Sequence, residues 1–437
     1  MIRPKDPTAG ITSDQAVKAI GNRYDLVLVG ARRMRELLRA FEEKGTLDSI
    51  GIGTVRDAVA DVLFPGLSTL HTRARYFFFI PWIYHGLEHD VRAGRVGASR
   101  LLAVAREREV ELMHALQAGG EEQLGIIGAR AGANVRTLPR DIYWGGLRRF
   151  GMLVFQGPSR SYLEAVAQGR RSRTSITRSD DGEAVAGALG AYWRPGIPSA
   201  PDGLMEGTSF DLTGQEAAYL LERIVDAAPG TLLAELAQRR PALQDANQSW
   251  QVPILGDLPA GVRDATQHAE CFSTVIYGAQ VLYNELLLMR MHADAGGGTN
   301  EGLDAVADAV AEQRAAWLSM MDDEQRKIGA WDRNEFWHLV LTENPRIPPP
   351  TRGFINGWVD AARTDPEGAL ADPQMHRAVV DREARLKGGL ARLTNQRARE
   401  QAEPPYGMEP LNYRWLAVAR QLITDISAGM DAGGAHA

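Results

Sequence analysis

The sequence predicts a mainly α-helical, multi-helical protein with two to three packed helical subdomains and few short strands. Many segments place apolar residues three and four positions apart, which is the period of a helix with one buried face. Helix-breaking pairs such as Pro65-Gly66 and Gly119-Gly120 separate these segments. A third observation is the apolar run from Tyr76 to Tyr84, which is too short to cross a membrane and therefore belongs to a core.

The stretch from Gly45 to Tyr84 is the most strongly specified part of the chain, and it predicts two helices. Apolar residues recur at helical spacing from Val55 to Leu63, and Pro65-Gly66 then ends the first helix. The second helix is apolar on all sides, which is typical of a buried helix, and we expect a kink or break near Pro81. The side chains expected to be mostly buried are Phe77, Phe78, Phe79 and Trp82.

Five charged residues within this stretch predict a structural ion network. Arg56, Asp57 and Asp61 lie on the first helix, while Arg73 and Arg75 precede the second. Asp57 and Asp61 share a helix face because they are four residues apart, so we expect them to pair with the arginines. The alternative is a helix-turn-helix in which Arg73 and Arg75 face phosphate groups.

Later segments predict further helices, separated by two irregular regions. A capping box is expected where Thr213 is followed three residues later by Glu216. Residues 169–178 (GRRSRTSITR) hold four arginines and no acid, and residues 344–353 (NPRIPPPTRG) are expected not to be helical because proline lacks a donor. The expected helices are Ala98–Ala118, Phe210–Ala237, Thr266–His292, Asp304–Met321, Arg333–Leu341, Phe354–Arg363, Pro373–Thr394 and Leu411–Ile426.

These patterns predict five consecutive regions along the chain. They are an N-terminal helical domain (1–167), a basic and Pro/Gly-rich loop (168–205), a central helical domain (206–343), a Pro-rich linker (344–353) and a C-terminal helical region (354–437).

Composition places the protein in the ordinary globular class. The chain has 437 residues, 44% of them hydrophobic and 24% charged, with a net charge of −6, so its surface as a whole does not attract nucleic acid. One cysteine allows no disulfide within the chain, and the first residues have no apolar core of a secretory signal. We therefore expect a cytoplasmic protein that does not enter a membrane and needs no cofactor.

The strongest candidate for chemistry is a pair of Glu-x-x-His steps. Such a step puts two ligands on one helix face in carboxylate-bridged di-iron bundles, where two further helices add one glutamate each. The candidates for these additional ligands are Glu270 and Glu285 on the expected central helix. With nine histidines in the chain, one such step is expected by chance. No H-E-x-x-H, P-loop or G-x-S-x-G motif is present, so no catalytic residue is assigned. The candidate metal ligands are Glu111, His114, Glu335 and His338.

Two segments are basic against the acidic average and are candidate nucleic-acid contacts. Residues 377–399, named here the basic segment, carry arginines every seven residues, which lays them along one helix side unless Gly388-Gly389 interrupts it. Neither segment has an aromatic side chain for stacking on bases, so contacts with phosphates are expected. The alternative is that both are simply solvated. The candidate residues are Arg170, Arg171, Arg173, Arg178, Arg385, Arg392 and Arg399.

Four pieces of the sequence carry a family resemblance. They are GTLDSIGIGTVRDAVADVLFPGLSTLHTRARYFFFIPWIY, GIIGARAGANVRTLPRDIYWGGLRRFGML, FSTVIYGAQVLYNELL and LNYRWLAVARQLITDI. This set resembles an uncharacterised bacterial family that is classed only as a domain of unknown function. The resemblance implies a setting near antiviral defence genes such as helicases and nucleases.

From this setting we expect a non-enzymatic scaffold or nucleic-acid-binding subunit of a defence complex with helicase or nuclease partners. A metal-dependent enzyme and a module that binds only protein are the alternatives.

Overall fold

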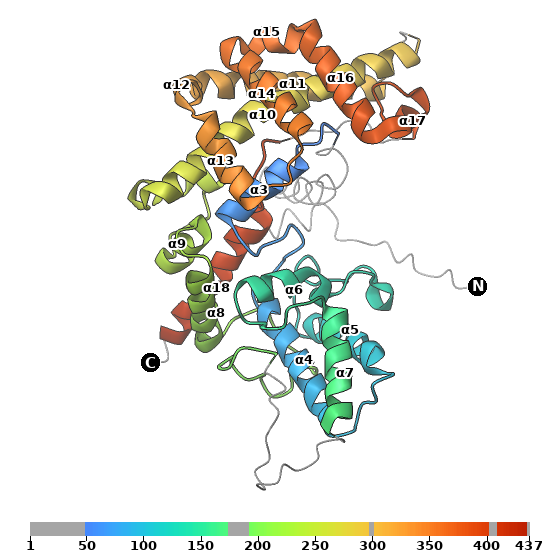
Figure 1. Cartoon of the computed structure of the whole chain (residues 1–437), viewed down its shortest axis with the longest axis vertical. Coiled ribbons are helices and arrows are strands. Elements are labelled where there is room, and N and C mark those ends of the chain that lie inside the picture. The colour runs from blue at the N-terminus through green and yellow to red at the C-terminus, as the bar shows by residue number, and fades with distance from the viewer. Residues whose placement is uncertain (1–48, 174–191, 297–300, 402–408, 435–437) are drawn as a thin grey trace, which may run out of the picture. The chain divides into compact units, whose positions relative to one another are not determined.

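The structure is a computed structural model that describes residues 49–173, 192–296, 301–401 and 409–434. Sixteen α-helices, α3 to α18, account for most of these residues (Figure 1). Within the described ranges, the β structure consists of one isolated bridge between Leu153 and Trp193. The predicted mainly α, multi-helical class is therefore confirmed. No helix among these residues is long and apolar enough to cross a bilayer.

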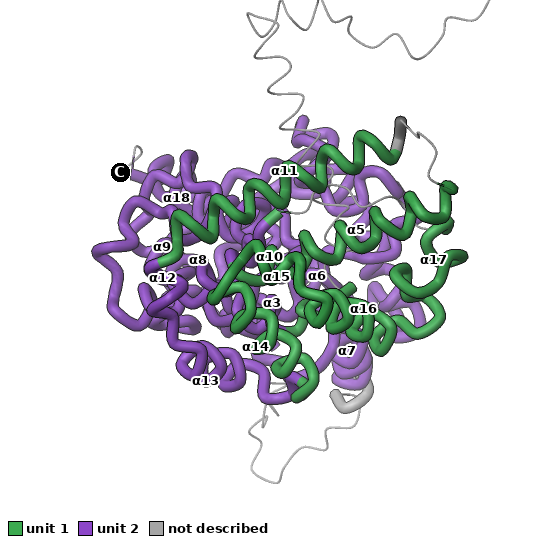
Figure 2. Tube along the Cα trace, turned by 90° about the horizontal axis from the view of Figure 1, so that it is seen from above, with its two compact units in different colours: residues 1–54, 275–325, 348–409 green, residues 55–274, 326–347, 410–437 purple. Residues whose placement is uncertain are grey.

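The chain divides into two compact units, each built from separate pieces of sequence (Figure 2). Unit 1 comprises residues 1–54, 275–325 and 348–409, and unit 2 comprises residues 55–274, 326–347 and 410–437. One dividing point falls within helix α10, Ala260–Asp294. The division into five consecutive regions, expected from the sequence, stays a prediction.

The first helical group of unit 2 surrounds α4 (Tyr76–Arg92), which packs against three other helices. Its aromatic residues at 77–79 are fully buried and Trp82 is 9% exposed, as predicted. Helix α4 continues through Pro81 without a break, because burial of the neighbouring side chains outweighs one missing backbone hydrogen bond. The packing partners are α5 (Leu101–Ala118), α6 (Pro139–Arg149) and α7 (Ser159–Arg173).

The second group of unit 2 consists of α8 (Gly214–Ala227), α9 (Leu232–Arg239) and α18 (Arg420–Gly434). One long helix was expected at 210–237, but Pro229 and Gly230, the latter with φ of 72°, separate α8 from α9. A short π-helical turn at Trp415–Ala419 leads into α18.

Helices α8 and α18 approach closely where glycines face each other. A Cβ placed on Gly433 would lie 2.9 Å from the Cα of Gly214, so a larger side chain does not fit there. The remaining elements of unit 2 include α12 (Gln325–Ala330), α13 (Arg333–Glu343) and most of α3 (Gly53–Leu63).

Unit 1 packs around two buried tryptophans, Trp317 and Trp358, whose ring centroids are 6.0 Å apart. A Cβ on Gly278 would lie 2.2 Å from the Trp317 ring, so only glycine permits this contact. The helices are the second part of α10, α11 (Glu301–Asp323), α14 (Pro349–Thr364), α15 (Pro366–Ala371), α16 (Pro373–Lys387) and α17 (Gln396–Glu400).

Two expectations for unit 1 are wrong at helix ends. Residues 349–353 of the expected Pro-rich linker form the first turn of α14, because a proline at the start of a helix loses no internal hydrogen bond. Helix α16 ends at Lys387 and does not reach Thr394, since Gly388 adopts φ of 52° and a 3₁₀ turn, η4, follows at Gly388–Leu390.

Candidate functional site

The arginines before α4 are held by carboxylates from distant parts of unit 2. The Nε of Arg73 donates to Asp425 Oδ2 at 3.0 Å, and the backbone N–H of Ala74 donates to the same oxygen at 2.8 Å. Arg75 donates to both oxygens of Glu216, each at 3.0 Å. Both guanidinium groups are therefore engaged within unit 2. This arrangement argues against the helix-turn-helix alternative, in which the same two groups face phosphate.

Asp57 has one of the expected partners, whereas Asp61 has a different one. Arg56 donates to its neighbour Asp57 at 2.9 Å. Asp61 accepts instead from Arg414, which also donates to the Leu67 carbonyl. The network thus includes all five predicted residues, but three further residues from α8, α18 and the segment before η5 complete it.

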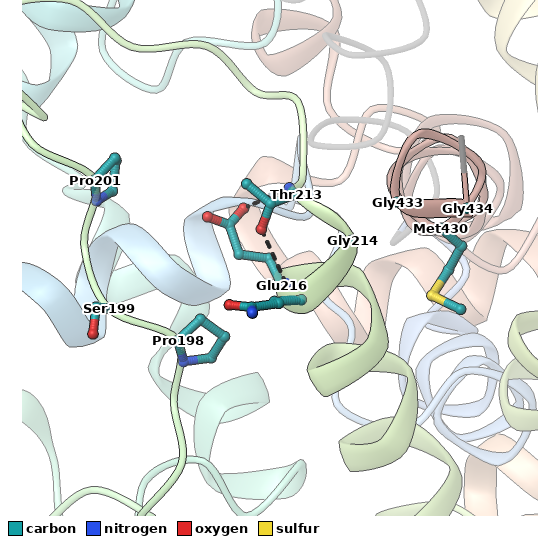
Figure 3. Close-up of a pocket in the computed structure, with 10 residues that line it drawn as sticks. Pro198, Ser199, Pro201, Thr213, Gly214, Glu216, Met430, Gly433 and Gly434 are labelled. Carbon is teal, nitrogen blue, oxygen red and sulfur yellow. Dashed lines mark hydrogen bonds between the residues drawn. The ribbon is translucent and has the colours of Figure 1, made fainter. Parts of the chain in front are cut away.

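A pocket of about 640 Å³ lies at the start of α8 (Figure 3). The loop at 198–201, the first turn of α8 and the last turn of α18 line it. Glu216 belongs to this lining, but its carboxylate accepts from Arg75 and from the Thr213 backbone N–H at 3.1 Å. The pocket has room for a small ligand, while its one carboxylate is already fully engaged.

A buried carboxylate lies inside the α4–α7 group. Glu109 on α5 is 1% exposed and accepts from the Tyr84 hydroxyl at 2.9 Å, while Arg140 lies 3.5 Å away. Burial, partly opposed by Arg140 and Tyr84, raises the pKa of Glu109 to about 7. The sequence analysis did not identify this residue. The sequence does indicate its burial, because Glu109 lies on the same helix face as the apolar Ala105 and Leu112.

A second buried carboxylate of this group also has two side-chain partners. Glu88 on α4 is 3% exposed and accepts from Tyr162 and Arg92. The Trp193 indole N–H donates to the Tyr162 hydroxyl at 2.9 Å, so a second aromatic side chain joins this hydrogen-bond chain. Both carboxylates therefore hold helices of this group together.

The predicted metal ligands do not come together. Glu111 and His114 lie exposed on α5, and Glu335 and His338 lie exposed on α13. The two glutamates considered as additional ligands have basic partners, since Glu270 pairs with Lys327 and Glu285 with Arg314. Across the part of the chain that the structure describes, no three His, Cys, Asp or Glu side chains form a group suited to a metal ion.

The first predicted nucleic-acid segment is only partly described. Arg170, Arg171 and Arg173 belong to the last turn of α7, and their side-chain positions are not described. Arg178 falls outside the described residues. Their role as phosphate contacts stays a prediction.

The basic segment, in contrast, is well defined. Arg385 lies exposed near the end of α16, whereas Arg392 donates to the Tyr283 hydroxyl at 3.1 Å and Arg399 donates to Asp294 at 2.7 and 3.0 Å. The three residues do not share one helix side, because α16 ends before the second of them. Two of these arginines thus stabilise the turn that connects α16 to α17.

A buried glutamate holds this turn in place. Glu383 is fully buried and accepts from the Tyr283 hydroxyl at 2.7 Å and from the backbone N–H groups of Arg392 and Leu393 at 3.0 and 2.8 Å. The neighbouring Arg382 donates to the Ile50 carbonyl and to the Thr351 hydroxyl at 3.0 and 2.7 Å. Charge-assisted hydrogen bonds of this kind are stronger than neutral ones, so the turn has a fixed shape.

The outer side chains of the basic segment face solvent. Arg377, Arg385 and Arg397 are exposed, and among the residues with described positions no carboxylate pairs with them. Leu386 and Leu390 are 46% and 74% exposed. The segment therefore presents unpaired cations together with apolar surface.

A comparison with protein families matches residues 24–429 to a family of unknown function, DUF6361. The chain belongs to that family. No match was found among curated proteins or among solved structures.

Proposed function

We propose that this DUF6361 protein is a non-enzymatic scaffold subunit that binds nucleic-acid phosphates through its basic segment. The observation that carries the proposal is the set of three exposed arginines, Arg377, Arg385 and Arg397, without carboxylate partners in the described structure. We further propose a bacterial antiviral defence complex with helicase or nuclease partners as its setting, which rests on the family resemblance alone.

The fixed shape of the turn supports this role. A guanidinium group binds phosphate best when little conformational freedom is lost on contact. Arg385 and Arg397 lie on either side, in sequence, of a turn held by Glu383, while Arg382 binds the end of α16 to the Ile50 carbonyl. The backbone that carries these two arginines is therefore set before any ligand arrives.

The overall charge restricts how such binding works. With a net charge of −6, the protein is repelled by nucleic acid at long range, so attraction must come from the local patch. Contacts with phosphates release counterions, and the affinity then falls linearly with salt on logarithmic axes. Strong salt dependence and little sequence dependence are the expected signature.

The test is binding of labelled duplexes to the full chain at about 50 mM salt and upward, measured by fluorescence anisotropy. The double variant Arg385→Ala/Arg397→Ala should bind more weakly, and by about the same factor for unrelated sequences. The slope of log affinity against log salt concentration should become shallower by about 1 for each arginine removed.

Arg346→Ala is the matched control, because Arg346 is exposed and belongs to unit 2, whereas the basic segment belongs to unit 1. If the double variant and this control both bind like the wild type, the basic segment is not the contact. Absence of any binding by the wild type at low salt would leave a module that binds only protein.

A further inference from the structure

Among the residues that the structure describes, Leu390 is the most exposed large apolar side chain, at 74%. It ends the 3₁₀ turn η4, Gly388–Leu390, directly after the two glycines that terminate α16. The next residue, Ala391, is fully buried, and Leu393 is 2% exposed. Leu390 therefore lies at the outer tip of a turn whose following residues are anchored in unit 1.

The backbone around Leu390 is fixed on both sides. After it, the N–H groups of Arg392 and Leu393 donate to the buried Glu383 carboxylate. Before it, the Gly389 carbonyl accepts from the Asn395 side chain at 2.5 Å, and Lys387 donates to the Ser49 hydroxyl at 3.0 Å. These bonds hold the turn in the shape in which Leu390 is exposed.

We propose that Leu390 is an apolar wedge that enters the minor groove of duplex DNA and partly unstacks one base step. This inference rests on the proposed phosphate binding, because Arg385 and Arg397 would hold the backbone while the leucine reaches the bases. Leucine is one of the side chains that minor-groove proteins insert between base steps, and the duplex then kinks away from the inserted side chain.

Two considerations favour duplex DNA over other partners. A stable protein interface buries about 800 Å² on each side. The exposed leucines of the basic segment, Leu386 and Leu390, offer a much smaller apolar area, and the same segment carries the exposed Arg377, Arg385 and Arg397. Among nucleic acids, the groove that admits a wedge of this kind is the minor groove of B-form DNA, while RNA duplexes are recognised mainly through shape and hydroxyl contacts.

The wedge predicts a dependence on DNA deformability rather than on base identity. Pyrimidine–purine steps such as TA unstack easily, and A-tracts are stiff. A duplex with a central TA step should bind more tightly than one with a central A-tract of equal length. This preference should disappear when Leu390 is shortened, because the phosphate contacts alone do not distinguish the two.

The experiment uses the full chain and a duplex of about 20 base pairs with a donor and an acceptor dye at its ends. Wild-type protein should change the energy transfer of the TA duplex on binding. Leu390→Ala should abolish that change and weaken binding about three- to tenfold, as expected for loss of a buried leucine contact. Its salt slope should equal that of the wild type, because no cation has been removed.

Leu124→Ala is the matched control, because Leu124 is 60% exposed and lies in unit 2. It should bind and bend the duplex like the wild type. If Leu390→Ala also bends and binds like the wild type, or if the protein binds only single strands, the wedge is refuted while arginine-dependent binding stands. If the wild type binds no DNA at low salt, the proposed function fails together with the wedge.

Discussion

The segment before α4 and the basic segment are both rich in arginine, yet they use it differently. In the first, Arg73 and Arg75 each pair with a carboxylate. In the second, Arg392 and Arg399 are held internally, while Arg385 has no such partner among the described residues. The number of arginines in a segment therefore says little about its role. What decides the role is whether a carboxylate or a hydroxyl group from elsewhere in the fold reaches each guanidinium group.

The largest effect on stability is expected from the deeply buried ion pair between Arg75 and Glu216. The side chains of Arg75 and Glu216 are 7% and 3% exposed. Glu216→Ala should lower the free energy of unfolding by about 3–5 kcal/mol, because it leaves a buried guanidinium group without its charge partner. Urea denaturation followed by circular dichroism measures this.

Gln215→Ala is the control for this prediction, since its side chain is exposed on the same turn of α8. A loss below about 1 kcal/mol for Glu216→Ala would show that Arg75 finds water or another partner. The contrast between the two arginine-rich segments would then be much weaker.

An intermediate effect is expected from Glu109, whose pKa is raised from 4.5 to about 7, mainly by burial. Between these two values the folded protein binds a proton that the unfolded chain has released. The resulting stabilisation is complete below pH 4.5 and is lost as the pH rises through 7. The change is at most about 3 kcal/mol, which corresponds to the shift in pKa.

Glu109→Gln should remove this part of the pH dependence, as measured by thermal or urea unfolding at a series of pH values. Glu111→Gln, which changes an exposed glutamate of the same helix, should leave the profile as in the wild type. Identical profiles for wild type and Glu109→Gln would mean that Glu109 stays ionised across this range, held by Arg140 and Tyr84.

The smallest effect on stability is expected in the basic segment. Arg385→Ala should change the free energy of unfolding by no more than about 0.5 kcal/mol, because the side chain is exposed and no internal contact is lost. The same variant should weaken DNA binding in the anisotropy experiment. A clear loss of stability would instead assign Arg385 to the fold, like Arg392.

The helices and the core of this protein were largely predictable from local patterns. The aromatic residues at 77–79 had no position available except a core, and the Thr213–Glu216 capping box followed from spacing. Local rules were less reliable at helix ends. The prolines at 349 and 350 start α14 instead of preventing it, while Gly388-Gly389 did signal the end of α16.

The partners of buried charges were not predictable. Asp425 lies 352 residues after Arg73, and Glu216 lies 141 residues after Arg75. No spacing rule connects such positions, since the tertiary fold alone brings them together. The same limit applies to Glu383, because its role depends on two backbone N–H groups whose direction is set by the turn after α16.

Glu216 has a consequence for local unfolding. The first turn of a helix usually opens more easily than its middle, and its amide protons exchange with solvent accordingly. Here Glu216 Oε2 accepts both from the Thr213 backbone N–H and from Arg75. Opening the first turn of α8 therefore also strands a buried guanidinium group beside α4. The start of α8 should exchange as slowly as the α4 core, so that the two helices open as a single cooperative unit.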